Sequence, residues 1–176
     1  ALAIGFVASG IGGILVGIPA LRLRGDYLAI ITLGFGQIIV KAIELFKFTG
    51  GASGLSKIPI NDNLILYLLI TMLVVFVLFT FMRSKYGRSI LAIREDAIAA
   101  ESSGINVTKV KIITLAFSAA LAGVAGVLLA QLNGRIDPKS FDFNQSINYL
   151  VIVVLGGLGS FTGSIISAIV LTLLPE

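Results

Sequence analysis

Residues 64–82 read LILYLLITMLVVFVLFTFM, an unbroken apolar run without a charged side chain. An α-helix rises about 1.5 Å per residue, so about 20 apolar residues cross a hydrocarbon core about 30 Å thick. This run therefore predicts a transmembrane helix. The same criterion extends outward to four more apolar blocks, at residues 1–20, 27–46, 110–132 and 147–174. We predict an all-α fold, a polytopic transmembrane helical bundle with about five spans.

The composition also indicates a membrane protein. Hydrophobic residues make up 57% of the chain and charged residues 12%, against about 45–50% and about 25% in soluble domains. The chain contains no cysteine and no histidine, which excludes disulfide frameworks, thiolate metal sites and histidine proton shuttles. A net charge of +4 would suggest nucleic acid as the partner of a soluble protein. Here the basic residues flank apolar blocks, so we expect a lipid bilayer and no nucleic acid.

The distribution of lysine and arginine predicts the orientation of the spans. If the spans alternate in direction, residues 21–26 and 83–111 share one side, and residues 47–63 and 133–146 share the other. The first side carries Arg22, Arg24, Arg83, Lys85, Arg88, Arg94, Lys109 and Lys111, and the second carries Lys47, Lys57, Arg135 and Lys139. Cytoplasmic loops have the excess of positive charge, so we expect 83–109 to be a cytoplasmic loop.

The chain begins directly in an apolar block, without Met. We interpret it as a truncated chain and expect a single transmembrane domain over 1–176.

The cytoplasmic loop contains the most informative stretch, GRSILAIREDAIAAESSG at 87–104. Four of its apolar residues, Ile90, Ile93, Ala97 and Ala100, share one helical face. Gly87 precedes the helix and Gly104 follows it. We therefore predict one short amphipathic helix. Such a helix could lie in the lipid headgroups or dock against another protein. Mixed charge, small alanines and the lack of aromatic residues favour protein docking.

Four stretches of the chain resemble one known family. They read LRLRGDYLAIITLGFGQII at 21–39, GGASGLSKIP at 50–59, GRSILAIREDAIAAESSGINVTKVKI at 87–112 and VVLGGLGSFTG at 153–163. Their order and content are similar to the permease subunits of branched-chain amino-acid ABC importers, of the subunit type that carries the LRLRGDY signature. The resemblance implies a permease domain in a prokaryotic cytoplasmic (inner) membrane. It also implies a sister permease, two ATP-binding cassette ATPase subunits and an extracytoplasmic solute-binding protein as partners.

In this family the cytoplasmic helix couples the permease to the ATPase. The family pattern is Glu-Ala-Ala, three residues and then Gly. Ala99, Ala100 and Gly104 match it, whereas Ile98 occupies the position of the Glu, so an acidic contact would have to come from a neighbouring acid. The resemblance implies an ATPase-coupling surface made of Gly87, Ile93, Arg94, Glu95, Asp96, Ala99, Ala100, Glu101 and Gly104.

The energy for transport is expected to come from those partners. The chain contains no GxxxxGK[ST] phosphate-binding loop, and its nearest string, DPKS at 137–140, lacks the preceding glycine. The charged residues within the spans, Lys41, Glu44 and Lys111, lie near span ends, unlike the mid-membrane charges of ion-coupled carriers. No nucleophile, base and oxyanion donors occur together. We therefore expect no enzyme activity and no bound cofactor, with ATP and Mg hydrolysed by the partner subunits.

Candidate translocation-pathway residues lie in the two least uniform blocks. They are Thr32, Gln37, Gly156, Gly157 and Gly159. Gln37 could instead form an interhelical hydrogen bond, and the glycines could serve close helix packing or a locally unwound segment. Two alternative functions also remain open. One is a permease of the same superfamily for another small solute such as urea or other amides, and the other is a passive channel or structural membrane subunit.

Overall fold

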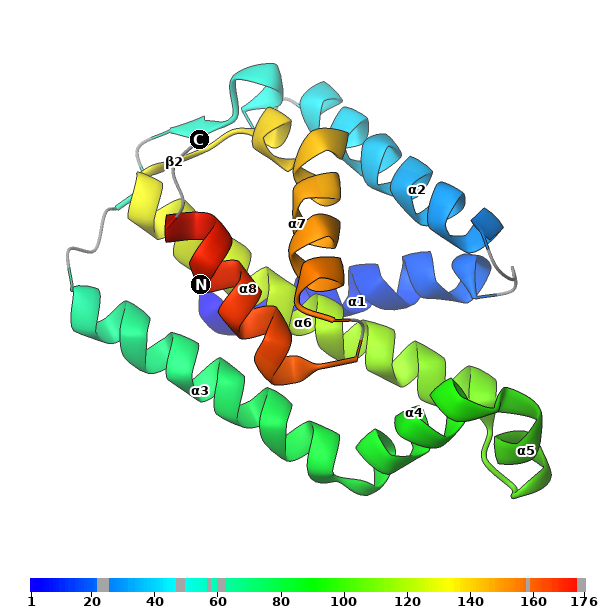
Figure 1. Ribbon diagram of the computed structural model, residues 1–176. Coiled ribbons are helices and arrows are strands. Elements are labelled where there is room, and N and C mark those ends of the chain that lie inside the picture. Colours follow the sequence, from blue (N-terminus) through cyan, green and yellow to red (C-terminus); the bar gives the residue numbers. More distant parts are fainter. Residues whose placement is uncertain (22–25, 47–49, 57, 60–62, 158, 174–176) are drawn as a thin grey trace. The chain divides into compact units, whose positions relative to one another are not determined.

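The computed structural model describes residues 1–21, 26–46, 50–56, 58–59, 63–157 and 159–173, without the side chains of 26–30 and 52. Within these ranges nearly all regular structure is helical (Figure 1), and the all-α polytopic membrane fold is confirmed. The α-helices are α1 (Leu2–Ala20), α2 (Asp26–Leu45), α3 (Leu64–Arg83), α4 (Lys85–Glu95), α5 (Ala97–Ser102), α6 (Val107–Asn133), α7 (Phe143–Leu155) and α8 (Phe161–Leu173). Short 3-10 helices, η2 (Gly51–Ser53) and η3 (Pro138–Phe141), and two-residue strands, β1 (Leu55–Ser56) and β2 (Arg135–Ile136), complete the described elements.

Three of these helices are long and apolar enough to cross a membrane, counted over the described part of the chain: α1, α3 and α6. They confirm the predicted spans at 1–20, 64–82 and 110–132. Helix α2 coincides with the predicted block at 27–46. The prediction of a single span at 147–174 is wrong, because α7 and α8 are separate helices of 13 residues each. Gly157 and Gly159, with φ of 91° and 92°, take the chain out of helical geometry after α7.

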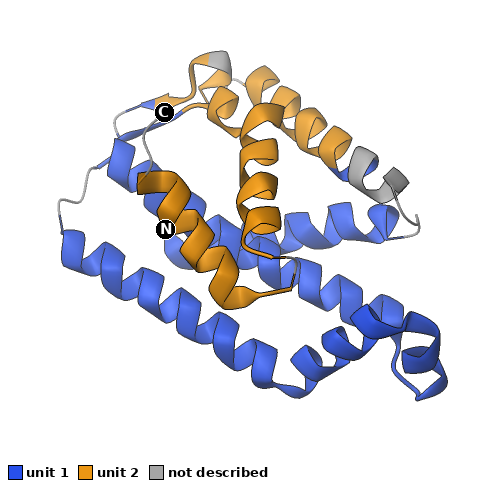
Figure 2. Ribbon diagram, viewed as in Figure 1, with its two compact units in different colours: residues 1–32, 56–136 blue, residues 33–55, 137–176 orange. Residues whose placement is uncertain are grey.

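The chain divides into two compact units (Figure 2). Unit 1 comprises residues 1–32 and 56–136, and unit 2 comprises residues 33–55 and 137–176. Helix α2 passes from one unit into the other. A single permease domain over 1–176 stays a prediction, since compact units occur within single domains as well as between domains.

Unit 1 is built on the packing of α1 against α6. Gly5, Gly13 and Gly17 recur along α1 at multiples of four residues, so they lie on one face. A Cβ added to Gly13 would lie 2.5 Å from the Cβ of Ala119 in α6, and one added to Gly5 would lie 2.6 Å from Val127. Small residues of this kind let transmembrane helices approach closely without a hydrophobic driving force. The buried core of unit 1 therefore forms along this interface.

In unit 2, helices α7 and α8 form a hairpin around a close glycine contact. A Cβ added to Gly156 would lie 2.6 Å from the Cα of Ser164, and one added to Gly163 would overlap the carbonyl oxygen of Gly156. The hydroxyl of Ser160 accepts a hydrogen bond from the amide of Gly163 at 3.2 Å, which satisfies an amide in the first turn of α8. The glycine run thus both interrupts the helix and permits close packing.

Candidate functional site

The predicted cytoplasmic helix begins at a tight turn after α3. Ser84 has extended backbone geometry and its hydroxyl accepts a hydrogen bond from the amide of Gly87 at 3.4 Å, as an N-cap does. Gly87 is buried, and a Cβ there would overlap the backbone of Met82. The prediction that Gly87 precedes the helix is wrong, since it lies inside α4. Glycine is needed at this position because α4 folds back onto the end of α3.

The prediction of one continuous helix over 87–104 is also wrong. Asp96 has φ −153° and ψ 111°, which ends α4, and its carboxylate then caps α5. The Oδ1 atom accepts hydrogen bonds from the amides of Ile98 at 2.8 Å and Ala99 at 3.1 Å. Asp competes for backbone amides in this way and therefore favours helix starts over helix interiors. Asp96 has a structural role here, as the connection between two short helices.

The C-terminus of α5 confirms the predicted position of Gly104. Its φ is +83°, its amide donates to the carbonyl of Glu101 at 2.9 Å, and the amide of Ile105 donates to the carbonyl of Ala100 at 3.1 Å. These two bonds form a Schellman-like cap, which satisfies carbonyls that the helix end would leave free. Helix α5 is therefore capped at both ends, although it has only six residues.

The side chains of α4 and α5 divide into an inner and an outer face. The predicted apolar face turns toward α6, with Ala100 only 4% exposed and Ile93 half-buried. On the outer face Ile98 is 79% exposed and Ala99 is exposed beside it. The α4–α5 segment (Lys85–Ser102) therefore uses its apolar stripe within the chain. The side chains it offers to a partner belong to the opposite face.

The remaining predicted coupling residues flank that outer face. Arg94 and Glu95 are exposed and form an ion pair at 2.7 Å. Glu101 and Gly104 line a hollow of about 680 Å³ together with the start of α6. There Asn106 caps α6 by accepting the amide of Lys109 at 2.9 Å. A second hollow, of about 520 Å³, lies between α4 and α6. The outer face of α5 thus stands beside the first hollow, a concave surface into which a partner protein could fit, whereas α4 lines the second.

The end of α3 is fixed to α6 by aromatic rings. Phe81 stacks on Phe117 of α6 with ring centroids 4.2 Å apart, and on Tyr86 of α4 with centroids 6.5 Å apart. Such aromatic pairs stabilise the fold by about 0.5–1.5 kcal/mol beyond the contribution of the surface area that they bury. The turn at Ser84 is therefore supported from both sides, and α3, α4 and α6 meet at this end of unit 1.

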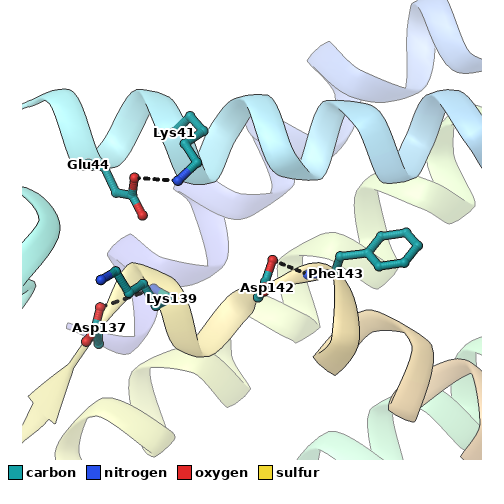
Figure 3. Close-up of polar contacts among 6 residues, drawn as sticks. All are labelled: Lys41, Glu44, Asp137, Lys139, Asp142 and Phe143. Carbon is teal, nitrogen blue, oxygen red and sulfur yellow. Dashed lines mark hydrogen bonds and ion pairs between the residues drawn. The ribbon is translucent and has the colours of Figure 1, made fainter.

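The predicted pathway residues are placed separately. Thr32 and Gln37 are both half-buried on α2. Gln37 lines a cavity of about 270 Å³ in unit 2, here named the charged cavity, whose other lining residues are Val40, Lys41, Glu44, Lys139 and Asp142. Figure 3 draws the four charged residues of this lining. Gly156, Gly157 and Gly159 lie at the break between α7 and α8 and do not line this cavity. Gln37, Lys41 and Glu44 share one face of α2 by their helical spacing, whereas Lys139 and Asp142 come from a segment that sequence position did not group with them.

The sequence profile of the family described as branched-chain amino acid transport system / permease component matches residues 1–176. The chain belongs to this family. A high-affinity branched-chain amino acid transport system permease protein, LivM of Salmonella typhimurium, is 38% identical to it over 97% of the chain and 48% of the relative. LivM of Escherichia coli K12, which carries the same description, is 39% identical over 93% of the chain and 47% of the relative.

Another relative, the permease protein LivH of Salmonella typhimurium, is 38% identical over a shorter part, 58% of the chain and 33% of the relative. The chain thus spans about half the length of the LivM relatives that it matches. No solved structure shows a significant match to it. Among the described residues of this family member, no group of three or more His, Cys, Asp or Glu side chains is arranged to hold a metal ion.

The charged cavity is the feature of this permease-family chain that sequence reasoning missed. Lys41 and Glu44 end the second apolar block, and Lys139 and Asp142 lie in the loop predicted for the same side of the membrane. That shared side, together with the spacing of Gln37, Lys41 and Glu44 on one helical face, was the available signal. It did not pair the two segments, because helix ends and loops on one side of a membrane can lie far apart.

Proposed function

We propose that this chain is part of the transmembrane permease subunit of an ATP-driven importer for leucine, isoleucine and valine. The observation that carries the proposal is the α4–α5 segment, whose outer face exposes Ile98 and Ala99 while its inner face packs on α6. A segment held by a cap at each end is suited to receive force from a docked protein. The descriptions of the LivM relatives support the substrate class.

The same proposal assigns the partners. The permease would pair with a sister permease, and the pair would bind two ATP-binding cassette ATPases, one of them at the α4–α5 segment of this chain. Substrate would arrive from an extracytoplasmic binding protein. ATP and Mg would be bound and hydrolysed by the ATPases, with no catalytic residue in this chain. The longer match to LivM than to LivH supports the LivM-type subunit. The bacterial relatives support a bacterial cytoplasmic membrane, and the positive-inside pattern supports residues 83–109 on its inner side.

The packing suggests how movement would pass through unit 1. Closure of the ATPases on ATP would displace the α4–α5 segment, which contacts α6, and α6 in turn is packed closely on α1. The spans would then shift between inward-open and outward-open arrangements. ATP acts in this scheme by stabilising one of the two membrane conformations over the other.

Retention of the ATPases during co-purification tests this function. The full-length permease is expressed with its sister permease and the candidate ATPases, as wild type, as Ala99→Arg and as Asn144→Arg. Ala99 is exposed on α5, so the arginine should block docking without disturbing the fold. Asn144 is exposed on α7 and controls for the added charge on the side predicted to be extracytoplasmic. Gly104→Arg is less informative, because a φ of +83° would strain any side chain there.

We expect the wild type and Asn144→Arg to retain the ATPases and Ala99→Arg to lose them. Equal retention by all three would place the coupling surface elsewhere. If the wild type retains no ATPase, the importer proposal fails and a passive channel or structural subunit becomes the better explanation. Uptake of leucine compared with urea into proteoliposomes holding the complete importer then separates the branched-chain proposal from an amide permease.

A further inference from the structure

The charged cavity in unit 2 combines two basic and two acidic side chains in a small space. Lys41 and Glu44 come from the last turns of α2, and Lys139 and Asp142 come from η3 and the residue that caps α7. Figure 3 shows the two segments facing each other. The lining therefore carries a net charge of zero with both signs present, which suits neither a simple cation nor a simple anion.

The charges in this cavity are unequally engaged. Lys41 and Glu44 form an ion pair at 2.8 Å, in which the glutamate side chain is only 15% exposed. The Asp142 carboxylate accepts a hydrogen bond from the amide of Phe143 at 2.7 Å. Its negative charge also lies close enough to act on Lys41. Lys139 is exposed, and its ammonium forms no ion pair with any residue that the structure describes. A positive group at one place and carboxylates at another are thus available to a ligand.

The rest of the lining is neutral. Val40, which is 9% exposed, adds an apolar surface, and Gln37 adds an amide that both donates and accepts hydrogen bonds. The volume of about 270 Å³ equals about nine water molecules at about 30 Å³ each. Pockets for drug-sized ligands begin at about 300 Å³, so this cavity suits a smaller molecule.

We propose that the charged cavity is a transit site for a free α-amino acid. Lys139 would face the α-carboxylate of the ligand, Asp142 and Glu44 its α-ammonium group, and Val40 the aliphatic side chain. A zwitterion satisfies both signs of charge at once, whereas a metal ion would meet two lysines and a free anion would meet two carboxylates. The inference rests on the proposed amino-acid import. Lys139 and Asp142 are exposed, so a ligand bound between them would have a direct route in and out, as a transit site requires.

Protection of an introduced thiol tests the site directly. Gln37→Cys is placed in the full-length permease, with other cysteines of that protein replaced, and the complete importer is reconstituted without its binding protein. The rate of alkylation by a small neutral maleimide is measured against the concentration of leucine. We expect saturable protection by leucine. Leucinamide, which lacks the carboxylate, and 4-methylvalerate, which lacks the ammonium group, should protect at least about tenfold more weakly, since each loses a charge-assisted contact.

Matched charge variants then assign the contacts. Lys139→Gln should weaken protection by leucine about tenfold, and Lys139→Arg should retain most of it. Arg83→Gln, which also removes one positive charge, lies on α3 outside both the cavity and the α4–α5 segment and should leave protection unaltered. If Lys139→Gln does not assemble, Asp142→Asn replaces it with the same expectation. Equal protection by leucine, leucinamide and 4-methylvalerate, or an unaltered curve for both cavity variants, would overturn the site.

The failure of this inference is distinguishable from failure of the proposed function. Uptake of leucine, with ATP and binding protein supplied, is measured for the wild-type importer and the Gln37→Cys importer in parallel preparations. ATP-driven uptake without any protection of the thiol in the Gln37→Cys protein overturns the transit site and leaves the importer intact. Loss of stimulation of the ATPase by the binding protein in Lys139→Gln, with protection unaltered, identifies the cluster as a docking surface and also overturns the site.

Discussion

Substitution of Gly123 by alanine should loosen the contact that builds unit 1. Gly123 lies in α6 opposite Ser9 of α1, and a Cβ added there would lie 2.5 Å from the Ser9 Cβ and 2.6 Å from the carbonyl oxygen of Gly5. Real Cβ atoms essentially never approach other atoms this closely. Because the obstacle includes backbone, a rotamer change cannot relieve it, and α1 must move away from α6.

The cost follows from overpacking and from one lost polar contact. Inserting a methyl group into a packed interior costs about 1–3 kcal/mol. The Ser9 hydroxyl lies 3.4 Å from the carbonyl of Ala120 in α6, a long hydrogen bond that separation would break; interhelical bonds in membranes average about 0.6 kcal/mol. We therefore expect Gly123→Ala to reduce the free energy of unfolding by about 2 kcal/mol.

Gly126→Ala is the matched control, since Gly126 lies in the same helix and a Cβ there meets nothing within 4 Å. Alanine is also the better helix former, so this variant should be neutral or slightly stabilising. Unfolding of the purified full-length permease by SDS, followed by helical circular dichroism, compares the two. Equal midpoints for both variants, or a Gly123→Ala midpoint equal to wild type, would show that α1 and α6 are not packed through these residues.

Two further substitutions test other parts of the fold. Asp96→Ala removes the acceptor of two amides at the start of α5, which should reduce the stability of that helix by about 1 kcal/mol. It should also weaken ATPase retention in pull-down assays several-fold. Asp96→Asn keeps a capping oxygen and should bind the ATPases as wild type does. Gly163→Ala should push α7 and α8 apart, because the added methyl group overlaps the carbonyl of Gly156, and it should lower the melting temperature in detergent. Gly36→Ala has open space around it and should leave the melting temperature unaltered. A lower melting temperature for Gly36→Ala than for Gly163→Ala would refute the hairpin packing.

The transmembrane helices were the most predictable part of the fold, because the length of an apolar run directly reflects the bilayer thickness. Even so, the apolar run and the helix do not end together. Helix α6 begins at Val107, before the predicted start at residue 110, because Asn106 caps it there. Lys109 and Lys111 interrupt the hydrophobic pattern without interrupting the helix. Hydropathy locates the membrane, whereas caps locate the helix ends.

The candidate coupling segment was predicted in position and wrong in form. The spacing of Ile90, Ile93, Ala97 and Ala100 gave the correct inner face, yet the same four residues lie on two helices. Residues spaced three or four apart can still face the same side when one extended residue separates two helices, because the cap sets the direction of the second helix. The period therefore carried no signal of the break, and the capping propensity of Asp96 was the only local sign of it.

The distribution of small residues indicates which helices should move together and which can move independently. Helices α1 and α6 meet through backbone and methyl groups that leave no room for a changed register, so they should behave as one body when the α4–α5 segment is displaced. Helix α3 has no buried residue and is joined to that body at its end, through the turn at Ser84 and the Phe81–Phe117 stack. A tilt of α3 about this end would alter few packed contacts within unit 1. The freedom that the proposed alternating access needs is therefore expected in α3 rather than between α1 and α6.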